Sequence, residues 1–204
     1  MASQTAPTRV PQEERTRAMR ARLLEATVEL LVEKGYAGTS TTLVSERAGV
    51  SRGAQLHHFP TKQDLVVAAV RHVTEVRGAE LAAAAENLPT GARRTRAVLR
   101  VLGDHFTSPV FTAALELWVA ARTDPALLAE VAPLEQQVGR ETHRMTVDLL
   151  GADESRPGVR ELVQATLDLV RGLGLADTIS DDRRRRTRIL DQWAHTLDRA
   201  LESA

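Results

Sequence analysis

Apolar residues recur at the three- to four-residue spacing of an amphipathic α-helix along almost all of this 204-residue chain. No segment shows the strict alternation of polar and apolar residues that marks a half-buried strand. Aromatic residues make up only 3% of the sequence, so leucine, valine and alanine must supply most of the core. Because leucine and alanine are strong helix formers, the sequence predicts an all-α fold.

Proline, glycine and short polar clusters divide this pattern into separate helices. The predicted helices span residues 12–34, 41–48, 52–58, 61–86, 92–106, 109–122, 125–150, 157–176 and 181–202. Gly35 is the expected stop of the first helix. Pro133 should kink or split the seventh helix, because proline lacks a backbone donor. Residues 1–11 contain no apolar run and are interpreted as a flexible tail.

Two short helices lie on either side of Gly49, which suits the left-handed residue that ends a helix. Ser40 and Ser51 are the predicted N-caps of these helices. Residues 61–64 form a predicted capping box at the start of the long fourth helix. These signals place two brief helices and a tight turn between residues 39 and 62.

Helices this short are unstable in isolation and must be held by packing. Five apolar residues are spaced to supply that packing: Tyr36, Val44, Ala48, Val50 and Phe59. Two short helices joined by a tight glycine-containing turn form a helix-turn-helix. We therefore predict a three-helix, helix-turn-helix DNA-binding domain over residues 12–60 and a larger helical domain over residues 61–204.

The second short helix of such a unit enters the major groove with its N-terminal end first. Arg52 stands at that end and is the candidate for base readout, because a guanidinium can pair with guanine O6 and N7. Gly53 and Ala54 have little side chain, so the backbone and thymine methyl groups can come close. We predict that these three residues contact bases.

Phosphate contacts are expected from residues at the edges of the same unit. His57, His58 and Lys62 lie at its far end, where cations or N–H donors can meet phosphates. Thr41 and Thr42 begin the preceding helix and can donate hydroxyl and backbone N–H groups to phosphate. These five residues complete the predicted DNA-binding set.

The net charge of the chain is zero, which by itself argues against a nucleic-acid-binding protein. Residues 1–77 carry 11 lysines or arginines against 8 acidic residues, whereas residues 78–204 carry 16 against 19. This mild asymmetry permits a DNA-facing N-terminal part, although ordinary scatter explains it equally well. Arg15, Arg17 and Arg20 either extend toward the minor groove or belong to a solvated helix face.

From Arg22 to Val70 the sequence resembles the TetR/AcrR transcriptional regulators. The matching positions are Gly35-Tyr36, Thr39-Ser40, Ala48-Gly49-Val50-Ser51, Gly53, His58-Phe59 and Lys62. The resemblance implies a three-helix DNA-binding domain on a six-helix ligand-binding and dimerisation domain. It also implies phosphate contacts from Thr41, His58 and Lys62, and base contacts from Arg52 to Ala54.

The recognition helix departs from the family pattern at Gln55 and Leu56, where many members have leucine and tyrosine. The tyrosine hydroxyl, a phosphate contact in the family, is therefore missing. Two interpretations are open. Gln55 either takes the place of the buried leucine, or the helix is turned so that Leu56 packs instead.

The C-terminal part carries weaker signals. Its candidate ligand-binding residues are His105, Phe111, Leu115, Trp118, Arg122 and His143. The apolar stripe around Trp118 is either the wall of a pocket or ordinary core. Arg122 and His143 are possible polar anchors, and the leucine, valine and aromatic content of residues 98–150 favours a mainly apolar ligand. The histidines lack the spacing of a helical metal pair, so we expect no metal and no cofactor.

The resemblance places dimerisation on the last two long helices, about residues 157–176 and 184–201. Gly172 and Gly174 fall inside the first of these, where glycine is costly unless it permits close packing. The run from Arg183 to Arg186 is interpreted as the exposed start of the last helix, neutralised by two preceding aspartates.

The leading hypothesis is a homodimeric repressor, released from a palindromic operator in double-stranded DNA by a small, mainly apolar molecule. Activation in place of repression is left open. An enzyme is disfavoured, because the sequence lacks a glycine-rich phosphate loop, a nucleophile elbow and paired catalytic carboxylates, and contains no cysteine. A helical protein-interaction module is the other alternative. No segment approaches the roughly 18 apolar residues of a membrane span, and we expect a cytoplasmic protein.

Overall fold

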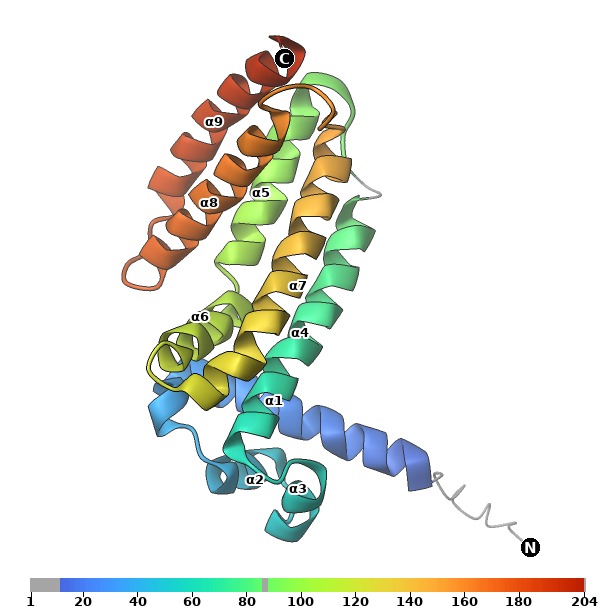
Figure 1. The fold of residues 1–204 in the computed structure, drawn as a ribbon, viewed down its shortest axis with the longest axis vertical. Coiled ribbons are helices and arrows are strands. Elements are labelled where there is room, and N and C mark those ends of the chain that lie inside the picture. Colours follow the sequence, from blue (N-terminus) through green and yellow to red (C-terminus); the bar gives the residue numbers. More distant parts are fainter. Residues whose placement is uncertain (1–11, 86–87, 204) are drawn as a thin grey trace, which may run out of the picture.

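The computed structural model describes residues 12–85 and 88–203. Within those residues the chain forms nine α-helices and one short 3₁₀ turn, so the predicted all-α fold is confirmed (Figure 1). The helices are α1 (Gln12–Gly38), α2 (Thr41–Ala48), α3 (Arg52–His58), α4 (Lys62–Ala85), α5 (Arg94–Phe106), α6 (Pro109–Ala121), α7 (Pro125–Leu150), α8 (Val159–Asp177) and α9 (Arg183–Ser203). The 3₁₀ turn η1 spans Gly91–Arg93. The tail predicted over residues 1–11, and Glu86 at the expected end of the fourth helix, lie outside the described residues.

Two helices, α1 and α7, differ from the prediction. The helical backbone of α1 is interrupted at Gly35, which has φ 67° and ψ 178°, but a further turn continues to Gly38. Pro133 does not split α7, which runs unbroken to Leu150. Pro133 and Ala129 are both exposed, so water can reach the carbonyl that loses its helical partner.

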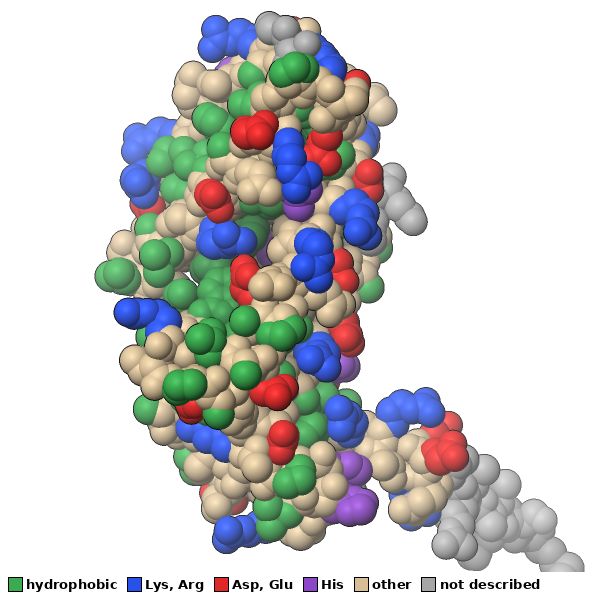
Figure 2. Space-filling view, in the orientation of Figure 1, with side chains coloured by type: hydrophobic (Ala, Val, Ile, Leu, Met, Phe, Trp, Pro, Cys, Tyr) green, Lys and Arg blue, Asp and Glu red, His purple; other side chains and the backbone are tan. Residues whose placement is uncertain are grey.

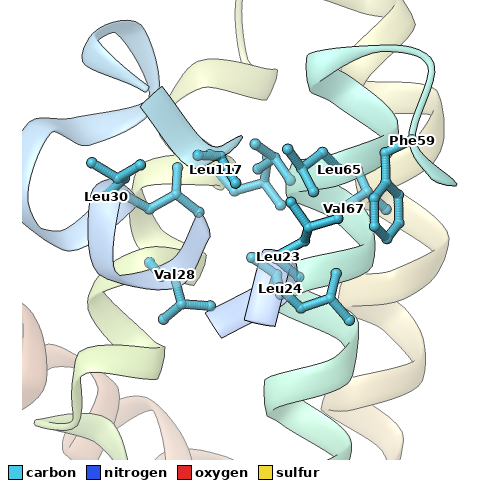
Figure 3. Packing of buried hydrophobic residues seen from close by; sticks show 14 of the residues in the cluster. Leu23, Leu24, Val28, Leu30, Phe59, Leu65, Val67 and Leu117 are labelled. Carbon is cyan, nitrogen blue, oxygen red and sulfur yellow. The ribbon is translucent and has the colours of Figure 1, made fainter. Parts of the chain in front are cut away.

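The long helices α4, α5, α7, α8 and α9 form the elongated body of the molecule, and α1, α2 and α3 lie at one end of it (Figure 1). The core at that end joins α1 to α4, α6 and the first half of α7. Figure 3 shows part of this packing, in which Leu23 and Leu30 of α1 lie near Leu65 of α4 and Leu117 of α6. The end formed by α1, α2 and α3 and the body therefore share one hydrophobic core at their junction.

A second core lies between α5, α8 and α9. Gly174 lies where α8 closely approaches the end of α5, because a Cβ atom there would overlap the carbonyl oxygen of Phe106. The predicted packing reason is thus confirmed for Gly174. Gly172 is exposed and has no atom within 4 Å of a hypothetical Cβ, so it has no such reason within one chain. Trp118 packs against both cores.

None of the helices in the described ranges is both long and apolar enough to cross a membrane.

Candidate DNA-binding surface

The turn between α2 and α3 is built from local hydrogen bonds. The Ser40 hydroxyl accepts from the Leu43 N–H at 3.3 Å, and the Ser51 hydroxyl accepts from the Ala54 N–H at 3.3 Å. Gly49 adopts φ 62° and ψ 38°, and its N–H donates to the Glu46 carbonyl at 3.2 Å. Both predicted N-caps and the predicted left-handed glycine are confirmed. We call the unit formed by α2, the turn and α3 the elbow.

Apolar side chains hold the elbow against α1 and α4. Val44, Ala48 and Phe59 are buried, and Tyr36 and Val50 pack against the same core while half-buried. The five predicted anchors therefore all contribute to this packing. These anchors come from the end of α1, from α2, from the turn and from the residue that follows α3, so the elbow is held against α1 and α4 along its length.

Gln55 is fully buried, and its Nε2 donates to the Phe59 carbonyl at 2.6 Å. Leu56 is 42% exposed. The first of the two interpretations of this pair is thus confirmed: Gln55 takes the buried position, and the helix is not turned to bury Leu56. The bond to Phe59 compensates the buried amide donor, which would otherwise be costly.

The opposite side of α3 faces solvent. Arg52, Gly53, Leu56 and His57 are exposed, and we call these four residues the outer face of α3. Figure 2 shows histidine and basic side chains at the end of the molecule where α2 and α3 lie in Figure 1. A convex helix that presents an arginine at its N-terminal end has the form needed to enter a major groove.

The other predicted DNA contacts on α2 and α3 differ in exposure. Ala54 and His58 are half-buried, and the imidazole of His58 makes an edge contact with His57 at 5.5 Å between ring centroids. At the start of α2, Thr42 is exposed and Thr41 is half-buried. All of these residues belong to the elbow, on α2 or α3.

Lys62 occupies a different environment from that expected of a free phosphate contact. Its Nζ donates to the Tyr36 carbonyl at 2.5 Å and lies 4.0 Å from the centroid of the Tyr36 ring. Burial lowers the pKa of the Lys62 amino group, and burial also raises the pKa of the Tyr36 hydroxyl. Lys62 thus ties the start of α4 to the end of α1.

The start of α4 is also capped as predicted. The Thr61 N–H donates to Asp64 Oδ2 at 3.1 Å, and the Asp64 N–H donates to Thr61 Oγ1 at 3.0 Å. This reciprocal pair is a capping box, which fixes the direction in which α4 leaves the elbow. Nearby, the Arg20 guanidinium lies 4.6 Å from the centroid of the Phe59 ring, while Arg15 and Arg17 are exposed.

A contact that the sequence did not reveal joins α6 to the same point. Glu116 Oε2 accepts from the Tyr36 N–H at 3.2 Å, across 80 positions in the chain. A Cβ on Gly35 would lie only 2.7 Å from that oxygen, so glycine permits the approach. We call Tyr36, Lys62 and Glu116 the Tyr36 clasp, because α4 and α6 bind opposite ends of one residue of α1.

A cavity of about 410 Å³ lies between α4, α5 and α7. Its lining residues are Thr74, Glu75, Gly78, His105, Val138, Glu141, Thr142 and Met145. Of the six predicted ligand-binding residues, His105 lines it. Because α4 contributes to this cavity and also begins at the Tyr36 clasp, one helix connects the cavity to the elbow.

The other five predicted ligand residues lie elsewhere. Phe111 is buried in the core, 6.1 Å from Trp118 between ring centroids, and Leu115 is half-buried on α6. Arg122 is exposed at the end of α6, and His143 Nε2 lies 2.7 Å from a carboxylate oxygen of Glu154. In the described part of the chain, no group of three or more histidine, aspartate or glutamate side chains is placed to hold a metal ion.

The α8–α9 face carries a wide, mainly apolar groove. Its lining residues are Ala165, Asp168, Leu169, Arg185, Arg188, Ile189, Gln192, Trp193 and Thr196. The Trp193 indole N–H donates to the Thr166 hydroxyl at 3.0 Å, which fixes the ring in this groove.

The arginine run at the start of α9 is neutralised by acidic side chains. Arg183 pairs with Asp181 at 2.7 Å, and Arg185 pairs with Asp182, as predicted. Arg186 differs from the expected exposed position, because it is buried and pairs with Asp177 at 2.6 Å.

Comparison with known proteins identifies the family. The family model described as "Bacterial regulatory proteins, tetR family" matches residues 23–69, which contain the elbow. The HTH-type transcriptional regulator CymR of Pseudomonas putida is 32% identical over 206 residues, which cover 96% of both chains.

Solved structures agree with this match. A member of the TetR family from Streptomyces coelicolor A3 is 26% identical and has a TM-score of 0.60, covering 86% of this chain and 97% of that one. The multidrug binding protein EbrR, solved with imidazole, is 26% identical and has a TM-score of 0.57, covering 85% of this chain and 93% of its own. With a relative that matches over 96% of both chains and an elbow that lies within the family model's match, this chain belongs to the TetR family of DNA-binding transcriptional regulators, a family without enzymatic activity.

Proposed function

We propose that this regulator represses transcription as a homodimer bound to a palindromic operator, and that a small, mainly apolar molecule releases it. Residues 12–60 would bind DNA, and residues 61–204 would bind the effector and dimerise. The observation that carries the proposal is the outer face of α3, where Arg52 and Gly53 stand exposed on an elbow fixed to the rest of the chain. In this proposal Arg52, Gly53 and Ala54 contact bases.

Phosphate contacts in the proposal come from the surrounding residues Thr41, Thr42, His57 and His58. Lys62 has a double role, because its amino group reaches the Tyr36 carbonyl and adds positive charge beside the elbow. Contacts to phosphate position the protein on DNA, while base contacts specify the sequence. Loss of a phosphate contact should therefore weaken binding to all DNA, whereas loss of Arg52 should weaken discrimination.

The α8–α9 face is the proposed dimer interface. Its groove is mainly apolar, and Leu175 is 50% exposed at the end of α8. Gly172 leaves open space on the exposed side of α8, into which a helix of a second copy can pack closely. A two-fold dimer presents two α3 helices, and such a pair requires an operator with two-fold symmetry.

The effector site in this proposal is the cavity between α4, α5 and α7. Val138 and Met145 supply apolar wall, while Thr74 and Thr142 supply hydroxyl groups for orientation. The solved relative EbrR is described as a multidrug binding protein, which supports a small-molecule site in this fold. A ligand can shift the protein away from the DNA-binding state only as far as it prefers the other state.

A gel-shift experiment tests the proposal directly. The full-length protein is titrated onto the DNA upstream of its own gene and onto random DNA of equal length, over a series of salt concentrations. Repressor function predicts sequence-preferring binding that weakens steeply with salt, because bound phosphates release counterions. Equal affinity for both DNAs would contradict the proposal. A reporter fused to the same promoter distinguishes repression from activation, since deletion of the regulator should raise expression.

A further inference from the structure

Leu56 is the one large apolar side chain on the outer face of α3, which is exposed to solvent. Its neighbour Gln55 is fully buried and bonded to the Phe59 carbonyl, so the orientation of α3 is fixed with Leu56 outward. At 42% exposure Leu56 is among the few large hydrophobic residues that the fold leaves uncovered. The packing of the elbow therefore does not account for a leucine at this position.

Leu56 lies on the same side of α3 as Arg52, the residue proposed to contact a base. Residues four apart on a helix are surface neighbours, so Leu56 lies one turn after Arg52 on the same side of α3. Gly53 lies beside both, and no atom comes within 4 Å of a hypothetical Cβ there. Nothing on the chain itself thus blocks a DNA base from approaching the strip between Arg52 and Leu56.

The chemistry of the major groove limits what a leucine can contact. The base edges there present hydrogen-bond donors and acceptors together with one apolar group, the C5 methyl of thymine. A leucine can satisfy none of the donors or acceptors, but it can bury a methyl group. We propose that Leu56 contacts the C5 methyl of a thymine close to the base that Arg52 contacts, and so specifies an A·T pair in each half-site.

This inference rests on the proposed operator binding by α3, and its test separates the two. The full-length protein first selects its preferred sites from a pool of random duplexes. Each thymine of the selected site is then replaced singly by uracil, which removes only the C5 methyl. For the wild type, one such replacement in a half-site should weaken binding about fourfold, the effect of burying one methyl-sized group.

The Leu56→Ala variant should bind the thymine and uracil forms of that site equally. Leu128→Ala is the matched control, because Leu128 has a similar exposure of 47% and belongs to α7, not to the elbow. This control should keep the wild-type preference for thymine. Leu56→Met, which retains an apolar side chain of similar size, should keep most of it. Circular dichroism of each variant checks that the overall helix content is unchanged.

Two results would overturn the inference alone: a selected site at which no uracil replacement weakens the wild type, or a Leu56→Ala variant that still prefers thymine. Uniform weakening of Leu56→Ala on all sites would also overturn it, since that pattern indicates a contact that does not depend on the base. A selection that yields no preferred sequence would overturn the proposed function itself.

Discussion

The elbow and the helical body are stabilised by different kinds of hydrogen bond. Those inside the elbow join residues close in the sequence, whereas those inside the body join residues far apart in the sequence. In the elbow, the caps of Ser40 and Ser51 join residues three apart. In the body, the Arg94 side chain donates to the Leu149 carbonyl at 2.8 Å across 55 positions, and the Thr95 hydroxyl bonds to Asp198 across 103 positions. The elbow is shaped by its own sequence, whereas the body depends on how distant helices are placed.

This difference matches what each region has to do. A DNA-binding face has to be rigid, and local caps together with buried anchors give α3 a single orientation. An effector cavity has to change when a ligand enters, and a cavity between three long helices changes when any of them moves. The Tyr36 clasp is one place where the two regions meet, because Glu116 of α6 and Lys62 of α4 both bind Tyr36.

The largest expected effect comes from the core that the two regions share. Leu31 is fully buried in α1, and Leu31→Ala should lower the free energy of unfolding by about 2–5 kcal/mol, through lost burial and a residual cavity. Urea unfolding followed by circular dichroism measures it. The neighbouring Val32 is 39% exposed, and Val32→Ala should change stability by less than about 0.5 kcal/mol. A similar loss of unfolding free energy in both variants would show that burial in this core does not stabilise the two regions.

The next effect concerns the clasp. Glu116→Ala removes the acceptor of the Tyr36 N–H and should lower the free energy of unfolding by about 1–2 kcal/mol, because this hydrogen bond is partly buried. It should also weaken operator binding, because the end of α1 beside the elbow loses its hydrogen bond to α6. Glu116→Gln keeps an oxygen acceptor and should restore most of both properties. If glutamine were as damaging as alanine, the charge and not the hydrogen bond would be responsible.

A smaller effect distinguishes the caps of the two regions. Ser51→Ala at the start of α3 and Ser108→Ala at the start of α6 should each cost about 1 kcal/mol of stability. Both hydroxyls accept from a backbone N–H, at 3.3 and 3.4 Å. Only the Ser51 variant should also lose operator affinity, as measured by fluorescence anisotropy at a temperature where both variants are folded. Equal losses of affinity would remove the distinction between elbow and body.

The smallest effect is a local one at the loop between α8 and α9. Hydrogen bonds from Arg183 hold the pKa of the Asp181 carboxyl at about 2, below its ordinary value of 3.8. A carboxyl with a lowered pKa stabilises the fold above pH 3.8, and this contribution is lost as the pH falls through about 2. NMR titration should show the Asp181 pKa returning toward 3.8 in Arg183→Ala. An unchanged pKa would mean that Arg183 is not the cause.

The contrast in contact range also explains what the sequence could predict. Caps, the left-handed Gly49 and the capping box at Thr61 depend on neighbours within a few residues, so these features were visible in the pattern. The sequence leaves two alternatives for the environment of Gln55, and only the packing of α3 decides between them. Gln55 could fill a leucine position because Phe59, one turn on, offers its carbonyl.

Features that depend on distant helices could not be predicted in the same way. Glu116 is one of many glutamates, and nothing near it in sequence indicates a bond to Tyr36. The stripe containing Phe111 and Trp118 has helical spacing, which is the same for a core and for a cavity wall. His105 lines the cavity between α4, α5 and α7, but its partners there come from residues 74–78 and 138–145.

The central claim is that the outer face of α3 enters a major groove with Arg52 against guanine. Methylation interference tests it most directly, because dimethyl sulfate places a methyl group on guanine N7, which lies in the major groove. For the full-length protein on its selected site, methylation of one guanine per half-site should block binding, and Arg52→Ala should bind methylated and unmethylated sites alike. Binding by the wild type that is indifferent to N7 methylation at every guanine would contradict the account.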